Sequence, residues 1–172
     1  MVNVLEDILM GKMSRDQMNK VVTWVGTDSK RYRILWEIAL RNEEPISRRA
    51  VWSMDIHQNK WPEMFAEDIS ELMDLIENPC HSALQRHIFK MLSLLPKIPE
   101  EHQGKLFDLG VNYTNNAILP IAVRVHAMEL AGRIALLYPE LQAELGTVLQ
   151  AHLKEGSAGF RSRANKWLKK MA

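Results

Sequence analysis

The sequence has little of what disulfide-rich secreted proteins and membrane proteins rely on. Of its 172 residues only one is cysteine, so no disulfide can form within the chain. No apolar run approaches the roughly 20 residues needed to cross a bilayer. The first seven residues contain two acids and no base, which is unlike a secretory signal. We therefore expect a protein of the reducing cytoplasm that does not associate with membranes.

The sequence also lacks the marks of β-structure. No segment alternates apolar and polar residues with the two-residue period of a strand. The seven prolines instead fall between, or at the start of, segments whose apolar residues recur every three to four positions. Proline suits the first turn of a helix and disrupts its interior. The predicted helices, the second of which Ser14 would cap, cover residues 3–10, 14–25, 28–41, 46–58, 62–77, 80–95, 100–115, 117–138, 139–154 and 157–171.

Four of these helices carry one pattern, repeated at spacings of 38, 39 and 37 residues from Ile46 through Leu84 and Val123 to Phe160. Apolar residues follow four and eight positions after each start, which predicts a buried helix face. The first of these two apolar residues is small in three helices, so a neighbouring helix can approach closely there. A basic residue also recurs, three positions after each start. The small residues are Ala50, Ala127 and Ala164, and the basic residues are Arg49, His87, His126 and Arg163.

Each of the four helices follows another amphipathic helix, so the repeating unit is a helix pair of 37–39 residues. Such a pair cannot bury its apolar face alone and must stack on copies of itself. The sequence therefore predicts an all-α solenoid in a single domain over residues 1–172. About four helix pairs would fill residues 28–172, and residues 1–27 would form N-terminal cap helices.

The segment Val123-Arg124-Val125-His126-Ala127-Met128-Glu129-Leu130-Ala131 resembles the second helix of a HEAT repeat, whose usual pattern is Val-Arg-x-x-Ala-x-x-x-Leu or Ala. The helix that starts at Phe160 matches with Phe in place of Val, whereas those that start at Ile46 and Leu84 lack the arginine. Over about residues 28–172 the chain is similar to HEAT-repeat proteins, among them small bacterial ones. The resemblance implies a right-handed, armadillo-like α-α superhelix whose second helices line a concave face.

On that face the resemblance implies a mostly basic strip. Because packed helices lie about 8–10 Å apart, four of them would make a strip on the order of 30 Å long. In one interpretation its side chains are solvated or pair with carboxylates of adjacent repeats, as Arg163 could with Glu129. In the other, the strip binds an extended acidic partner. The strip consists of Arg48, Arg49, Trp52, Asp55, Arg86, His87, Lys90, His126, Glu129, Arg133, Arg163, Lys166 and Lys170.

Two classes of partner fit an acidic ligand. A protein segment is favoured, because concave solenoid faces bind proteins. Nucleic acid is the weaker choice, since its binding domains tend to be strongly basic and the net charge here is +1. The leading hypothesis is therefore a non-enzymatic protein-interaction module. A nucleic-acid-binding protein is the alternative, and a purely structural subunit of an assembly is a third interpretation.

The nucleic-acid alternative has one enzymatic form. Trp52 and Asp55 lie three residues apart, on one side of a predicted helix. Alkylpurine DNA glycosylases of the HEAT-like class use tryptophans and an aspartate on the concave face, so the resemblance implies that Asp55 would stabilise a cationic sugar. The competing interpretation is that Trp52 packs and Asp55 is solvated or salt-bridged. Trp167 falls close to the buried face and supplies no second stacking ring.

Other chemistry is not predicted. The six histidines are scattered without the spacing of a metal site, and residues 156–159 lack the spacing of a phosphate-binding loop. We therefore predict no metal and no cofactor. Cys80 stands at a helix start but has no evident base beside it, so no catalytic residue is predicted. His87 and His126 are expected at the surface.

Overall fold

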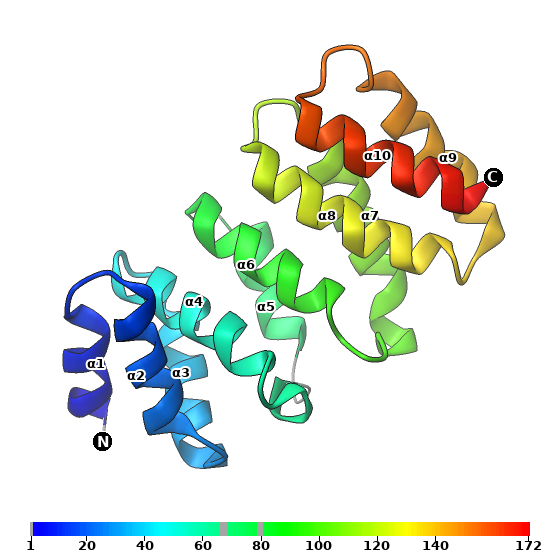
Figure 1. Cartoon of the computed structure of the whole chain (residues 1–172). Coiled ribbons are helices and arrows are strands. Elements are labelled where there is room, and N and C mark those ends of the chain that lie inside the picture. The colour runs from blue at the N-terminus through cyan, green and yellow to red at the C-terminus, as the bar shows by residue number, and fades with distance from the viewer. Residues whose placement is uncertain (1, 66–68, 79–80) are drawn as a thin grey trace. The chain divides into compact units, whose positions relative to one another are not determined.

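The computed structural model describes residues 2–65, 69–78 and 81–172 (Figure 1). These residues form α-helices and one short 3₁₀ helix, and within them there is no strand, so the predicted all-α fold is confirmed. The elements are α1 (Val2–Met10), α2 (Arg15–Val25), α3 (Ser29–Leu40), α4 (Ile46–Gln58), the 3₁₀ helix η1 (Pro62–Phe65), α5 (Ile69–Glu77), α6 (Ser82–Ser93), α7 (Glu100–Asn115), α8 (Ile121–Ala135), α9 (Pro139–Ala151) and α10 (Ala158–Met171).

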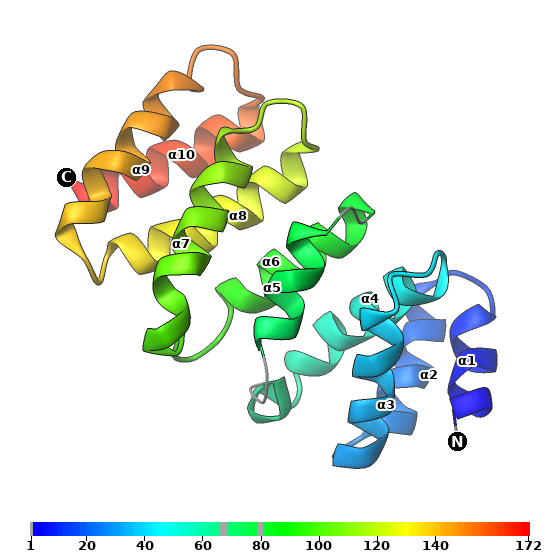
Figure 2. The ribbon, with the colours of Figure 1, turned by 180° about the vertical axis from the view of Figure 1, so that it is seen from behind.

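The chain divides into two compact units, residues 1–91 and residues 92–172. In the first unit α1, α2 and α3 all pack against α4, and α5 packs against α3. In the second unit α7 lies along α8, while α9 and α10 pack on α8 and on each other. Figures 1 and 2 show these arrangements from opposite sides. The repeated helices of the sequence are α4, α6, α8 and α10, each of them the second helix of its pair.

Capping residues determine where several helices begin or end. The Ser14 hydroxyl accepts a hydrogen bond from the Gln17 amide at 3.2 Å, which confirms the predicted cap of α2. The Asp28 carboxylate accepts from two amides at the start of α3, and Ser157 caps α10 in the same way as Ser14. Helix α2 ends at Gly26, whose φ of +52° lies in the left-handed region that glycine adopts without strain.

Two predicted helices are exact at both ends, and others are wrong by a few residues at one end or both. Helices α4 and α7 begin and end where predicted. The helix predicted over residues 117–138 is shorter, because Pro120 holds an extended ψ of 139° and α8 starts only after it. The helix predicted over residues 62–77 is a 3₁₀ turn followed by α5, and residues 66–68 lie outside the described residues. Cys80 lies outside them as well, so its predicted helix is described only from Ser82.

The predicted apolar face forms the core of both units. Ala50, Ala127 and Ala164 are all fully buried. The close approach expected at the small residues is evident between α7 and α8, where a Cβ added to Gly110 would lie 3.0 Å from the carbonyl oxygen of Ala127 and 2.9 Å from the Cβ of Ala131. A glycine and two alanines therefore bring these two helices together.

Candidate functional site

Three of the four recurring basic residues, Arg49, His87 and Arg163, connect their second helix to an earlier helix. On α4, Arg49 donates from Nη1 to the carbonyl oxygens of Leu9 and Gly11, both at 2.7 Å. On α10, Arg163 forms an ion pair with Glu129 of α8 at 2.6 Å. The interpretation that basic residues pair with adjacent repeats is thus confirmed for Arg163. At these positions much of the positive charge is already used to hold helices together.

In the first unit, the recurring basic residue of α6, His87, belongs to a buried polar cluster around Asp55 of α4. Asp55 is only 4% exposed. Its Oδ2 accepts a hydrogen bond from Nδ1 of His87 on α6 at 2.9 Å, and Lys90 Nζ lies 2.7 Å from Oδ1. Burial on its own would raise the pKa of Asp55, but the hydrogen bonds from His87 and Lys90 together outweigh it and hold that pKa below its ordinary value. The carboxylate therefore stays ionised in the fold.

Arg86 fixes the tautomer of His87. A guanidinium only donates hydrogen bonds, so Nε2 of His87 accepts the bond from Arg86 Nη2 at 2.7 Å. The ring proton then sits on Nδ1, where it is donated to Asp55. Arg86, His87 and Asp55 form a chain of hydrogen bonds, in which each nitrogen of the imidazole has one partner.

The expectation that Asp55 and His87 face solvent is wrong. His87 is 6% exposed, because α6 lies over α4 and its side chains cover the carboxylate. A buried carboxylate is tolerated only when it is paired in this way. The sequence could not reveal the pairing, because the apolar period does not give the offset between α4 and α6.

Trp52 acts as a packing residue beside this cluster. Its half-buried ring lies nearly parallel to the ring of His87, at 21° with centroids 6.4 Å apart. It also packs against the buried cluster formed by Met18, Val22 and Ile56. With both oxygens of Asp55 engaged by α6, the tryptophan and the aspartate do not present a free carboxylate beside an open aromatic face.

The second unit carries its basic residues nearer the surface. Lys166 and Lys170 on α10 are exposed, and Lys170 Nζ lies 4.6 Å from the ring centroid of Trp167, which is buried as the sequence predicted. On α8, Arg133 is half-buried and donates to the carbonyl oxygen of Ser93. Burial lowers the pKa of Arg133, yet an arginine remains charged.

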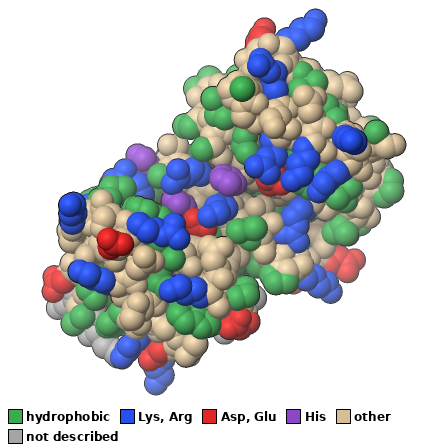
Figure 3. All heavy atoms as spheres, viewed as in Figure 1, with side chains coloured by type: hydrophobic (Ala, Val, Ile, Leu, Met, Phe, Trp, Pro, Cys, Tyr) green, Lys and Arg blue, Asp and Glu red, His purple; other side chains and the backbone are tan. Residues whose placement is uncertain are grey.

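The charge balance on the second helices is alike in the two units. Among the residues predicted for the strip, each unit has four cations of lysine and arginine and a single carboxylate. In Figure 3, which has the view of Figure 1, lysine and arginine side chains are seen over the second helices of each unit. The cations are Arg48, Arg49, Arg86 and Lys90 with Asp55 in the first unit, and Arg133, Arg163, Lys166 and Lys170 with Glu129 in the second.

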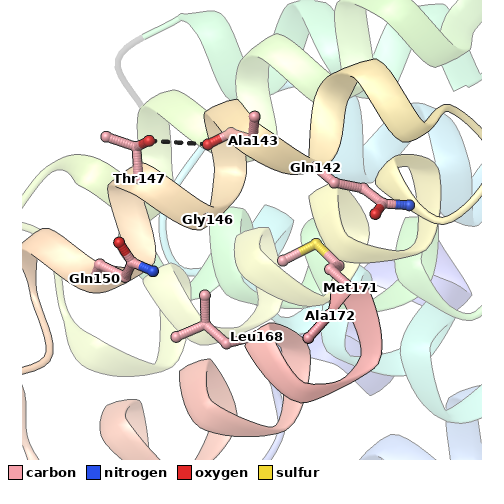
Figure 4. Close-up of a pocket in the computed structure, with 8 residues that line it drawn as sticks. All are labelled: Gln142, Ala143, Gly146, Thr147, Gln150, Leu168, Met171 and Ala172. Carbon is pink, nitrogen blue, oxygen red and sulfur yellow. Dashed lines mark hydrogen bonds between the residues drawn. The ribbon is translucent and has the colours of Figure 1, made fainter.

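A hollow of about 410 Å³ lies between α9 and α10 (Figure 4). The Thr147 hydroxyl at its wall donates to the carbonyl oxygen of Ala143 at 2.9 Å, and Leu168 and Met171 close the side of α10. None of its lining side chains is titratable. The hollow is concave, but none of the side chains that line it could carry out acid–base chemistry.

Neither a metal site nor a membrane span is found among the described residues. Within them, no three or more histidine, cysteine, aspartate or glutamate side chains gather as metal ligands would. No helix among them has both the length and the apolar character needed to cross a bilayer.

A family model described as HEAT repeat domain matches residues 5–171, a range that includes most of α1 and all of α2. The chain belongs to the HEAT-repeat family. The resemblance predicted from Val123 to Ala131 is thereby confirmed, and the helices form the α-solenoid architecture of that family. No curated protein matches the chain, and no solved structure does. HEAT repeats generally serve as protein-interaction modules and are typically not enzymes.

Proposed function

We propose that this HEAT-repeat protein is a non-enzymatic, cytoplasmic interaction module that binds an acidic segment of a partner protein on its second helices. Residues 1–172 would act as a single repeat domain, with residues 1–27 as its cap. The observation that carries the proposal is the excess of positive charge at the strip positions of α8 and α10, where four cations meet one carboxylate, Glu129.

The positive charge of α10 lacks a counter-charge of its own. Residues 157–172 contain five bases and no acid. Of the five, Arg163 is paired with Glu129, whereas the exposed Lys166 and Lys170 form no ion pair with any residue that the structure describes. An acidic segment placed here would relieve repulsion among the lysines and would be steered to them by their field.

The first unit supports the proposal less strongly, because its cations are already engaged. Arg48 pairs with Glu44 at 3.3 Å, Arg86 donates to His87, and Lys90 pairs with Asp55. We therefore infer that α8 and α10 make the main contact and that the basic residues of α4 and α6 contribute mainly to stability.

The test is affinity capture from the native cytosol with a charge-reversed variant, Lys166→Glu with Lys170→Glu. A control variant, Lys105→Glu with Lys154→Glu, changes the net charge equally on α7 and on the turn after α9. A protein captured by the wild type and by the control, and lost with the α10 variant, supports the proposal. Equal capture by both variants contradicts it.

The same variants address nucleic acid, the alternative ligand. A labelled duplex at low salt, about 50 mM, would be bound by the wild type and released as salt rises if phosphate were the ligand. The buried, paired Asp55 gives the glycosylase form of this alternative no support from geometry. Absence of duplex binding at low salt would end the nucleic-acid reading.

A further inference from the structure

A pocket of about 370 Å³ lies in the second unit, between the end of α8 and the segment that precedes α7. Its apolar wall is formed by Pro96, Ile98, Leu136 and Leu137. The two leucines follow the last turn of α8 and are 43% and 59% exposed. Large aliphatic side chains at such exposure, gathered at a concavity, mark a binding surface more often than isolated ones do. We refer to it as the Leu137 pocket.

Gln103 holds the floor of the Leu137 pocket rigid. Its Nε2 donates to the carbonyl oxygen of Ile98 at 2.8 Å, and its Oε1 accepts from the Tyr138 hydroxyl at 2.6 Å. These bonds join the segment before α7 to the turn after α8. Because the amide is engaged at both ends, the pocket is formed before any ligand arrives.

Two cations border the apolar wall, Arg133 and Lys97. Neither forms an ion pair with any carboxylate that the structure describes, and no acid lines the pocket. The Arg133 side chain donates a hydrogen bond to the carbonyl oxygen of Ser93, which uses one of the five N–H donors of its guanidinium. Burial lowers the pKa of Arg133, as expected of a cation that has lost water without gaining an anion.

We propose that the Leu137 pocket binds a partner segment in which a large aliphatic residue stands beside an aspartate or glutamate. The aliphatic side chain would lie against Ile98 and Leu137, and the carboxylate would pair with Arg133 and Lys97. An Arg–carboxylate pair that is partly desolvated is stronger and more directional than one in water. The proposal rests on the proposed function, since Arg133 belongs to the basic surface of α8, and it defines which acidic segments that surface prefers.

The size of the pocket favours a short anchor. Its volume lies at the lower end of the roughly 300–1,000 Å³ range of small-ligand sites. It can therefore accommodate one or two side chains but not the whole face of a helix. The acid beside the anchor would account for selectivity, because an aliphatic residue alone would leave both cations unpaired.

The experiment is a selection of random displayed peptides on the whole wild-type chain, followed by fluorescence anisotropy with an enriched, labelled peptide. We expect enriched peptides to carry Leu, Ile or Met next to Asp or Glu. Leu137→Ser and Arg133→Gln should each weaken binding about tenfold, the equivalent of losing one well-buried contact. Arg133→Lys should restore part of the loss, because it keeps the charge.

The matched control is Leu94→Ser. Leu94 is an equally exposed leucine of the second unit, at 50%, and does not line the pocket. Its substitution should leave peptide binding unchanged. Since Leu94 and Leu137 are both exposed already, circular dichroism and the melting temperature should show that both variants fold.

The outcomes separate this inference from the proposed function. Loss of binding in the Leu137 and Arg133 variants alone supports the pocket. Acidic peptides that bind Leu137→Ser normally but lose binding with Lys166→Glu and Lys170→Glu would overturn the pocket and leave the proposed function standing. Enrichment of no acidic peptide at all would overturn both.

Discussion

Both units join consecutive second helices through a contact between a carboxylate and the recurring basic residue, but at different depths. In the first unit the side chains of Asp55 and His87 are 5% and 8% exposed. In the second unit the side chains of Glu129 and Arg163 are 19% and 43% exposed. One sequence signal, a basic residue three positions into the repeated helix, thus gives a buried network in one unit and a surface pair in the other.

The difference extends to the core of each unit. The first unit buries a carboxylate and two histidines, whereas residues 92–172, all of which are described, bury no carboxylate and one arginine, Arg124. The second unit relies instead on close backbone approach, with Gly110 set against Ala127 and Ala131. Directional hydrogen bonds specify the packing of the first unit, and the fit of small residues specifies that of the second.

The largest effect should come from Asp55→Ala. The substitution leaves His87 without its acceptor and Lys90 without its anion, so we expect a loss of about 2–4 kcal/mol in the free energy of unfolding. Hydrogen exchange measured by mass spectrometry should show the loss of protection chiefly in residues 2–65 and 81–91. Glu129→Ala is the matched control, because it removes a carboxylate at the corresponding contact. Equal losses in the two variants would contradict the comparison.

The sequence was sufficient to predict the fold because the fold depends on local patterns. Pro45 and Pro99 mark the starts of α4 and α7, and the apolar period gives their buried faces. The candidate site was predictable only in part. The pair of Glu129 and Arg163 could be named in advance, since both lie on exposed sides of repeated helices.

The burial of Asp55 could not be predicted, because it depends on how far α6 lies over α4. The period assigns a side chain to a face of its own helix but does not give the offset between neighbouring helices. The Leu137 pocket was missed for a related reason. Residues 136–138 were predicted as helix, and only the turn after Ala135 brings Leu137 beside Ile98. Two leucines directly before Tyr138-Pro139 were the signal that could have indicated it.

The second prediction concerns the close packing of the second unit. Gly110→Ala should lower the free energy of unfolding by about 1–3 kcal/mol, because the new methyl group meets backbone that cannot move away. Gly104→Ala on the same helix has nothing within 4 Å and should raise it by about 0.5–1 kcal/mol through helix propensity. Urea denaturation of both variants measures the difference. If Gly110→Ala were as stable as Gly104→Ala, the close approach would not contribute to specificity.

The third prediction is a dependence on pH that only the first unit should show. His57 is fully buried between the rings of Tyr32 and Trp61, and its Nε2 donates to the Gly26 carbonyl oxygen at 2.7 Å. Burial lowers the pKa of His57, an effect that this hydrogen bond offsets in part. Below the ordinary value of 6.5 the unfolded chain therefore binds a proton that the folded chain does not, and stability falls as pH falls.

Protection from hydrogen exchange in the first unit should decrease as the pH is lowered from neutral to 5. In His57→Gln most of this pH dependence should be lost. The pKa of Asp55 is also lowered, but its ordinary value is 3.8, so its contribution is lost only at more acidic pH. Between neutral pH and pH 5, therefore, His57 contributes to the pH dependence of stability and Asp55 does not. An unchanged slope in His57→Gln would assign the effect to another group.

The smallest effect should come from the exposed pair of the second unit. A double-mutant cycle of Glu129→Ala and Arg163→Ala should give a coupling energy of about 0.2–1 kcal/mol, since an exposed pair gains little over solvated charges. Added salt should reduce it further, whereas the cycle of Asp55→Ala and His87→Ala should keep most of its coupling because neither side chain is open to ions. If both cycles gave the same energy and the same salt dependence, burial would not distinguish the contacts. A larger value for the buried pair would show that depth outweighs the charge of the donor in what the repeated basic residue contributes.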